Sequence, residues 1–368
     1  MEGICTVKII TGEEWVVFDR DFNSELTPDI IQFLSNYQRV IFGCGFPDED
    51  LPEERDLNLI YELILGAKFN QPVNNLPNSI THLILGGIFN HPVDIYDEDS
   101  PTGKSSILPN SITFLVLGGE DFNQPVDNLP ESVTELIFGY RFNQPINNLP
   151  NGLTTLKFYE HSNFNQPVDN LPDSLTYLHF GDCFNQSIEF LPENLEELYL
   201  GNYYDLPINN LPSSLIYLNT GHGFNQPINN LPSSLKKVEL GQEFDQALCL
   251  ENLSNLTDLT ICDDYNKSLK NIPESVTHFK INGDFLKENY EEDPLESLPR
   301  SITHFTVAGK FDFLPVSTKF FKAERGIFMN DIKNLIDTIQ EITMPNIPPN
   351  IHDHIKKYIP KNIKVNFY

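Results

Sequence analysis

The chain has 368 residues and a formal net charge of -28, from 52 acidic and 24 basic side chains. No apolar stretch reaches the roughly 20 residues that a membrane-spanning helix needs, and no basic stripe could neutralise the phosphates of a nucleic acid. We therefore predict neither a nucleic acid nor a membrane as a partner. The acidic side chains are expected mainly to keep the protein soluble.

Residues 1–41 are expected to form an N-terminal cap. Two strands, Cys5–Ile10 and Trp15–Asp19, flank the turn TGEE. A short helix should follow, with Thr27 at the N-cap and Pro28 at the first helical position. Such a segment would cover the open end of a repeat array.

We expect a cytoplasmic protein that is not secreted. The N-terminus has no basic region followed by a long apolar run, which argues against a secretory signal. The cysteines are scattered, odd in number and without Cys-x-x-Cys spacing, as in a reducing compartment, and they predict neither disulfides nor a zinc site. They are Cys5, Cys44, Cys183, Cys249 and Cys262.

A motif beginning Phe-Asn-Gln-Pro recurs along most of the chain. It reads FNQPVNNLPNSITHLILGG from Phe69 and FNQPVDNLPESVTELIFG from Phe122. Most steps between copies are 20 residues, and self-similarity at such a period predicts a solenoid whose coils contact only their neighbours. We place this solenoid at residues 42–311.

Each coil has fixed apolar positions that predict one short strand. Leu153, Leu156 and Phe158 close one copy with the spacing of a strand that buries one face. The pair Leu149-Pro150 bars a helix from continuing through that point. A glycine usually follows the strand, as at Gly139, and suits a tight turn with an unusual backbone angle. Stacked coils would bury these side chains in common, with their strands in a parallel sheet.

The segments LGGIFN, FGYRFN, FGDCFN and TGHGFN resemble the FNIP repeats, short leucine-rich-like repeats of giant viruses and social amoebae. The resemblance implies a right-handed leucine-rich-repeat-like solenoid, with a parallel β-sheet on the concave face and extended or turn segments on the convex side. It also implies a giant-virus protein that acts in host cytoplasm. Many viral members carry an N-terminal F-box, which residues 1–41 do not show.

The Asn that follows each Phe is expected to form an asparagine ladder between coils. Asp replaces it at Asp205 and Asp245, and we expect weaker rungs there because a carboxylate cannot donate a hydrogen bond. The predicted ladder comprises Phe69, Asn70, Phe89, Asn90, Phe122, Asn123, Phe142, Asn143, Phe164, Asn165, Phe184, Asn185, Phe224 and Asn225.

Strand positions that point away from the core vary from coil to coil, whereas the core positions hardly change. This contrast is typical of an array built for recognition, and clustered aromatic side chains are typical of binding hot spots. A second interpretation stays open, because tyrosines also suit exposed strand positions in general. The predicted partner-binding residues on the concave face are Lys157, Tyr177, His179, Glu197, Tyr199 and Tyr217.

No catalytic, cofactor or metal site is expected. The sequence has no Gly-rich phosphate loop and no nucleophile elbow. His352 and His354 would diverge on a helix, and the histidines at outward strand positions come from distant coils. Two acidic insertions, at 94–106 and 287–297, are either solvated loops or partner-binding segments, and both interpretations stay open.

From about residue 312 to 368 we expect a C-terminal cap with one or two helices. Residues 330–342 have helical spacing, residues 348–359 could form a second helix, and NIKVNF at 362–367 could be a last strand. The apolar face of this cap could alternatively serve self-association as a homodimer.

The predicted function is a non-catalytic scaffold that binds a protein partner on its concave sheet face. A self-assembling or virion structural protein is the first alternative. The substrate-recognition part of a ubiquitin ligase system is the second, and it rests only on the family resemblance.

Overall fold

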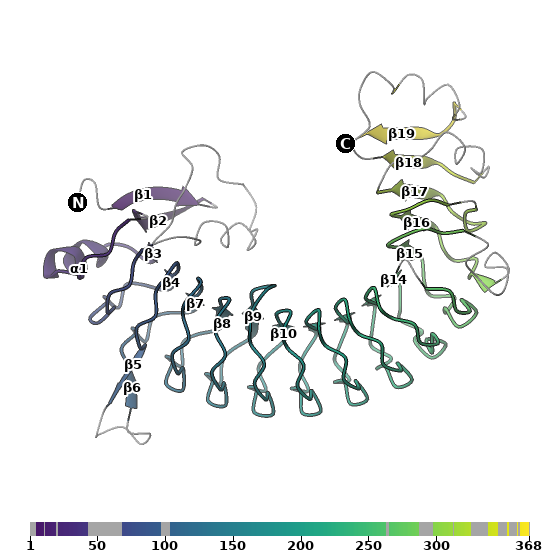
Figure 1. The fold of residues 1–368 in the computed structure, drawn as a ribbon. Helices are drawn as coiled ribbons and strands as arrows, with labels where there is room; N and C mark the ends of the chain where they lie inside the picture. Colours follow the sequence, from purple (N-terminus) through teal and green to yellow (C-terminus); the bar gives the residue numbers. More distant parts are fainter. Residues whose placement is uncertain are drawn as a thin grey trace. The chain divides into compact units, whose positions relative to one another are not determined.

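In the computed structural model, the chain folds into two compact units, Met1–Leu195 and Glu196–Tyr368. The structure describes residues 5–10, 12–19, 21–42, 68–96, 104–262, 265–286, 297–311, 313–324, 338–344, 352, 359 and 361–367. In the repeated part of each unit, every coil contributes one short strand, and turns complete the rest of the coil (Figure 1). This is the solenoid that the repeat period predicted, and it has the leucine-rich-repeat-like form that the family resemblance implied.

The first unit begins with an antiparallel pair and continues as a parallel sheet. β1 pairs with β2, and β2, β3, β4, β7, β8, β9 and β10 then follow one another in parallel. The strands are β1 (Cys5–Ile10), β2 (Glu13–Phe18), β3 (Arg39–Phe42), β4 (His82–Leu85), β7 (Phe114–Leu117), β8 (Glu135–Phe138), β9 (Thr155–Phe158) and β10 (Tyr177–His179).

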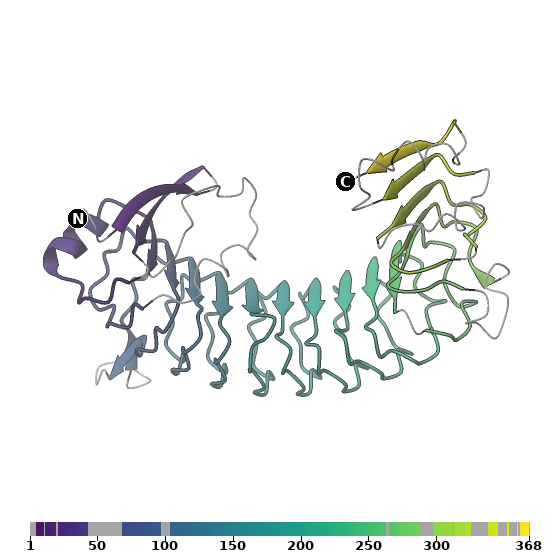
Figure 2. The same ribbon diagram turned by 45° about the horizontal axis from the view of Figure 1, so that its top comes forward.

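The second unit is parallel throughout, and consecutive strands pair in chain order, as the arrows in Figure 2 show. Its strands are β11 (Glu197–Tyr199), β12 (Tyr217–Asn219), β13 (Lys237–Glu239), β14 (Asp258–Ile261), β15 (His278–Ile281), β16 (His304–Val307), β17 (Phe320–Ala323), β18 (Glu341–Met344) and β19 (Lys364–Phe367).

The core of each unit is a set of side-chain columns, because equivalent positions of successive coils lie above one another. Phe122, Phe142 and Phe164 are fully buried, and their rings stack with centroids 6.1 Å apart. In the second unit, Phe224 and Phe244 stack at 6.2 Å. One coil could not bury these rings alone, so each coil depends on its neighbours for its core.

The two strands and the short helix predicted near the N-terminus are present. α1 (Pro28–Leu34) begins after Thr27, whose hydroxyl oxygen accepts a hydrogen bond from the Ile30 N–H at 3.4 Å. Pro28 suits the first helical position because its missing N–H would have no partner there. Ile30 and Leu34 are buried against the unit. None of the helices that the structure describes has the length and apolar content needed to cross a membrane.

The C-terminal prediction is wrong in one respect. The helix expected over 330–342 does not continue to its end, because Glu341 and Ile342 belong to β18. Ile342 is fully buried and lies in register with Phe321 of β17 and Val365 of β19. The sheet thus continues past residue 312, and the strand expected in 362–367 is confirmed as β19. The rest of the first expected helix and most of the second, at 348–359, lie outside the described residues.

The glycines after the strands are needed for close approach more often than for an unusual backbone angle. A Cβ atom at Gly139 would lie 2.4 Å from the Gly119 carbonyl oxygen of the preceding coil. Gly221, which follows β12 in the same way, does have a positive φ, 72°. The sequence identified the right residues, but at Gly139 the physical reason is contact between coils.

The first acidic insertion, 94–106, is a short hairpin at its base. β5 (Asp94–Tyr96) pairs antiparallel with β6 (Lys104–Ser106), as Figure 1 shows. The second insertion, 287–297, lies outside the described residues except at its last position.

Candidate functional site

The candidate binding site is the outward face of the sheet, which we define as the strand positions on either side of the buried central residue. In β12, for example, Leu218 is fully buried, whereas Tyr217 and Asn219 on either side of it are half-buried. This alternation follows from the period-two geometry of a strand. The sequence therefore placed these residues on the correct side of the sheet.

In the first unit, the outward face of β9 and β10 is more buried than expected. Lys157 and His179 lie in register on neighbouring strands. Lys157 is only 7% exposed, and His179 is half-buried. Burial lowers the pKa of His179 to about 3, and the positive charge of Lys157 contributes to this shift. The imidazole is therefore neutral at physiological pH, and Tyr177 offers a partner more surface than Lys157 does.

In the second unit, Tyr199 and Tyr217 make direct contact, with ring centroids 4.7 Å apart and planes at 46°. The Tyr199 hydroxyl donates a hydrogen bond to Glu197 Oε2 at 3.4 Å, and Lys237 Nζ lies 4.8 Å from the centre of the Tyr217 ring. We call these four residues, together with Asn219 and Glu239, the tyrosine cluster. Each belongs to β11, β12 or β13.

A hydrogen bond and a salt bridge hold the remaining members of the tyrosine cluster in place. Asn219 donates from Nδ2 to Glu239 Oε2 at 3.1 Å, and Lys237 Nζ pairs with Glu239 Oε1 at 2.7 Å. Burial raises the pKa of both tyrosines. Tyr217 and Glu197 raise the pKa of Tyr199 further. Glu239 raises the pKa of Tyr217 further, whereas Asn219 and Tyr199 lower it. Both hydroxyls therefore stay protonated at physiological pH and remain hydrogen-bond donors.

The structure brings together only part of the predicted set. Glu197, Tyr199 and Tyr217 lie together in the second unit, and Lys157 and His179 are neighbours in the first. Asn219, Lys237 and Glu239 were not among the predicted binding residues. The strand alternation could have identified them, because they occupy outward positions of β12 and β13, one or two coils after Tyr199.

The asparagine ladder is present on the turn side of the coils. In six successive rungs, the ladder side-chain oxygen accepts the backbone N–H of the next ladder residue, at 2.9 to 3.0 Å. A glutamine amide from the later coil reaches the same oxygen, as Gln144 does to Asn123 at 3.2 Å. The ladder begins one rung earlier than predicted, at Asn23, which accepts from Asn70.

Aspartate fills a rung without loss of these bonds. Asp205 Oδ1 accepts from the Asn225 N–H at 2.9 Å and from Gln226 Nε2 at 3.0 Å. These distances match those at the asparagines. The expected weakness therefore has no support in the geometry at Asp205, because the bonds from Asn225 and Gln226 use the carboxylate as an acceptor.

Replacing Asn143 by alanine should lower the free energy of unfolding by about 1–3 kcal/mol, because the Asn165 N–H and Gln166 Nε2 would lose the oxygen they donate to. Asn143→Asp should change the free energy of unfolding by less than about 0.5 kcal/mol, because the aspartate keeps the accepting oxygen. Urea unfolding followed by circular dichroism measures both. Equal losses for the two variants would show that the ladder needs the side-chain amide as a donor.

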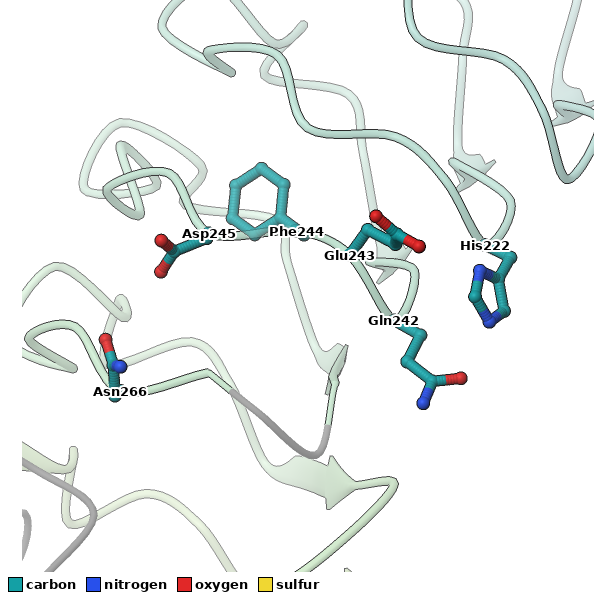
Figure 3. A pocket seen from close by; sticks show the side chains of 6 residues that line it. All are labelled: His222, Gln242, Glu243, Phe244, Asp245 and Asn266. Carbon is teal, nitrogen blue, oxygen red and sulfur yellow. The ribbon is translucent and has the colours of Figure 1, made fainter.

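A shallow pocket of about 350 Å³ lies on the turn side of the second unit. Figure 3 shows His222 and Gln242 at one end of it and Asp245 and Asn266 at the other, so their side chains do not converge. Asp245 is a ladder residue and pairs with Lys267 Nζ at 3.1 Å. Within the described ranges, no three His, Cys, Asp or Glu side chains are grouped so that they could hold a metal ion.

Comparisons with known proteins agree with this geometry. A family model for the FNIP Repeat matches six overlapping segments between residues 102 and 243, each about two coils long. A search of the curated proteins gives no match. Among solved structures, the chain is similar to CroV588, described as a novel circular leucine-rich-repeat protein, with 29% identity and a TM-score of 0.63.

The alignment with CroV588 covers 99% of this chain and 60% of that protein. YopM from Yersinia enterocolitica WA-314 aligns at 15% identity and a TM-score of 0.36, over 90% of this chain and 67% of YopM. The FNIP matches lie within the stacked coils, and the CroV588 alignment spans them. Residues 102–243 are FNIP repeats, and the chain is built as a leucine-rich-repeat-like solenoid.

Proposed function

We propose that the protein is a non-catalytic interaction scaffold whose outward sheet face binds a protein partner. The observation that carries this proposal is the contrast across each strand. Leu178, Leu198 and Leu218 repeat at the buried position, whereas the outward positions of the same strands change chemistry from coil to coil. A fixed framework with variable contacts suits recognition, and repeat arrays commonly bind along such an extended surface.

The tyrosine cluster supports this proposal as the centre of the contact. Tyrosine is enriched in binding hot spots, and here two tyrosines are held by each other, by Glu197 and by Lys237. Side chains that are already ordered lose less conformational entropy when a partner binds. Tyr177 on β10 of the first unit supplies a third tyrosine on the same kind of face.

The test is affinity purification from expressing host cells, with the bound proteins identified by mass spectrometry. The variant Tyr177→Ala/Tyr199→Ala/Tyr217→Ala should lose the specific partner, with a drop in affinity of about thirtyfold or more, as for hot-spot residues. Circular dichroism and thermal unfolding of the variant establish that it still folds.

Tyr203→Ala is the matched control, because Tyr203 is 68% exposed and lies in a turn, outside the strands. It should retain every partner that the wild-type chain captures. If the triple variant still captured the specific partner, the assignment of the binding site to this face would be refuted. Light scattering over a concentration series distinguishes self-assembly, which would appear as growth in mass without any other protein.

We also propose the cytosol as the setting of this interaction. Cys5, Cys183, Cys249 and Cys262, the cysteines among the described residues, all carry thiols rather than disulfides. Thiols are usual in a reducing compartment.

A further inference from the structure

Two histidines lie side by side on the outward face of the second unit. His278 of β15 and His304 of β16 are in register on neighbouring parallel strands. Their rings stack with centroids 4.1 Å apart and planes at 17°. The expectation that the outward histidines come only from distant coils is therefore wrong for this pair, because consecutive coils place equivalent strand positions next to one another.

The same contact orients both imidazoles. His278 Nδ1 lies 2.9 Å from Thr277 Oγ1, and His304 Nδ1 lies 3.0 Å from Thr303 Oγ1, so each ring bonds to the hydroxyl of the preceding residue. Because Nδ1 is engaged in both rings, Nε2 is the nitrogen that remains for a ligand. Two stacked rings that are anchored in the same way present their Nε2 atoms on the same side.

Neighbouring side chains hold the pair from both directions. Phe320 of β17 stacks on His304 with centroids 4.5 Å apart and planes at 15°, and it is in register on the side away from His278. Asp258 Oδ1 of β14 lies 3.8 Å from His278 Nδ1. His304 is thus held between two rings, and His278 lies between a ring and a carboxylate.

The imidazole of His304 is in the form that can bind a metal ion. Burial, followed by the neighbouring His278, lowers the pKa of His304, against an opposite effect of Asp258. The ring is therefore neutral at physiological pH and keeps a nitrogen lone pair for coordination.

The spacing of the two rings is close to that of two ligands on one ion. A zinc ion binds imidazole nitrogen at about 2.0–2.1 Å, so two nitrogens on one tetrahedral ion lie about 3.4 Å apart. The ring centroids are 4.1 Å apart, so a tilt of the two Nε2 edges towards each other closes the difference. The side chain of His278 is 48% exposed, which leaves room for this tilt without any movement of the strands.

We propose that His278 and His304 bind a divalent transition-metal ion of the Zn²⁺ class through their Nε2 atoms, with water completing the coordination. The Nδ1–H of each ring would donate to its threonine hydroxyl, an outer contact of the kind that fixes the tautomer and orientation of metal-binding histidines. Mg²⁺ should not bind here, because it prefers oxygen ligands. The site is independent of the proposed function and shares no residue with the tyrosine cluster.

The test is isothermal titration calorimetry of the full chain with zinc chloride. The wild type should show one site that is tighter than the background binding of zinc to the acidic surface. His278→Gln and His304→Gln should each weaken this site by about tenfold or more, since even the loss of an outer contact can cost that much. Thr277→Val/Thr303→Val keeps both ligands and should weaken the site severalfold. Circular dichroism establishes that each variant folds.

His82→Gln is the matched control. His82 has the same contact, from Nδ1 to Thr81 Oγ1 at 2.8 Å, but it stacks on Phe114 instead of on a second histidine. It should bind zinc like the wild type.

The proposal is overturned if the wild type shows no such site, if either histidine variant binds zinc unchanged, or if magnesium chloride titrates the same site. It is also overturned if His82→Gln weakens the site as much as His278→Gln, since zinc would then be an adventitious ion only. The triple tyrosine variant should keep the zinc site, so failure of this proposal is distinguishable from failure of the proposed function.

Discussion

Phe142→Ala should lower the free energy of unfolding by about 3–5 kcal/mol, the usual cost of emptying a buried phenylalanine site. The ring is fully buried and stacks on Phe122 and Phe164, each at 6.1 Å, and on Phe138 at 3.8 Å. These neighbours come from the coils on both sides, so the cavity cannot close without moving the ladder bonds that join those coils.

Phe190→Ala is the matched control for Phe142→Ala, because Phe190 belongs to the same unit and is 64% exposed. It should change the stability by less than about 0.5 kcal/mol. Urea unfolding, monitored by circular dichroism, gives both values. A loss below about 1 kcal/mol at Phe142 would contradict a core whose layers depend on adjacent coils, because even modest core truncations cost about that much.

The stability of the first unit should fall as the pH is lowered from about 6.5 towards 3. Burial, followed by the charge of Lys157, lowers the pKa of His179 from 6.5 to about 3. The unfolded chain therefore binds a proton in this window that the folded chain does not, and protonation favours unfolding. The slope attributable to His179 should be on the order of 1 kcal/mol per pH unit.

The check on His179 is a set of urea unfolding curves between pH 7 and pH 4. His179→Gln should flatten the pH dependence. Lys157→Gln should reduce the total loss of stability at low pH, because removing one cause of the shift brings the pKa of folded His179 closer to its unfolded value. His222→Gln, which replaces an exposed histidine, should leave the wild-type profile unchanged. A His179→Gln profile that coincides with that of the wild type would show that other groups control acid unfolding.

The solenoid could be predicted from the sequence because its determinants recur. Phe142, Leu153 and Leu156 return one coil later as equivalent residues, and a copied pattern that buries one face permits few folds. The ladder followed from the same register. The strand at Glu341–Met344 was missed because its hydrogen-bonding partners, β17 and β19, lie about 20 residues away on either side, and the apolar spacing before it indicates a helix.

The outward face was predictable in position but not in exposure. Strand alternation placed Lys157 and Tyr217 on the same kind of face, yet Lys157 is 7% exposed and Tyr217 is half-buried within a bonded cluster. Burial there depends on side chains of neighbouring coils, such as His179 beside Lys157, which a pattern within one strand does not contain. Strand register places Tyr217 beside Glu197 and Tyr199 beside Asn219, so the contact between the two tyrosine rings is diagonal and depends on side-chain conformation as well.

The ladder also has a consequence for how such a chain can change in length. Each rung between Asn123 and Asn143, or between Asn143 and Asn165, joins equivalent atoms one coil apart. Duplication or loss of one whole coil by unequal recombination would leave every donor facing an acceptor. A gain of another size must be accommodated in a turn between rungs, as in the 22-residue step from Asn143 to Asn165, or must leave the stack and return to it, as the hairpin of β5 and β6 does. Chains of this type should therefore evolve mainly in steps of one coil, with intermediate lengths confined to turns and projecting hairpins.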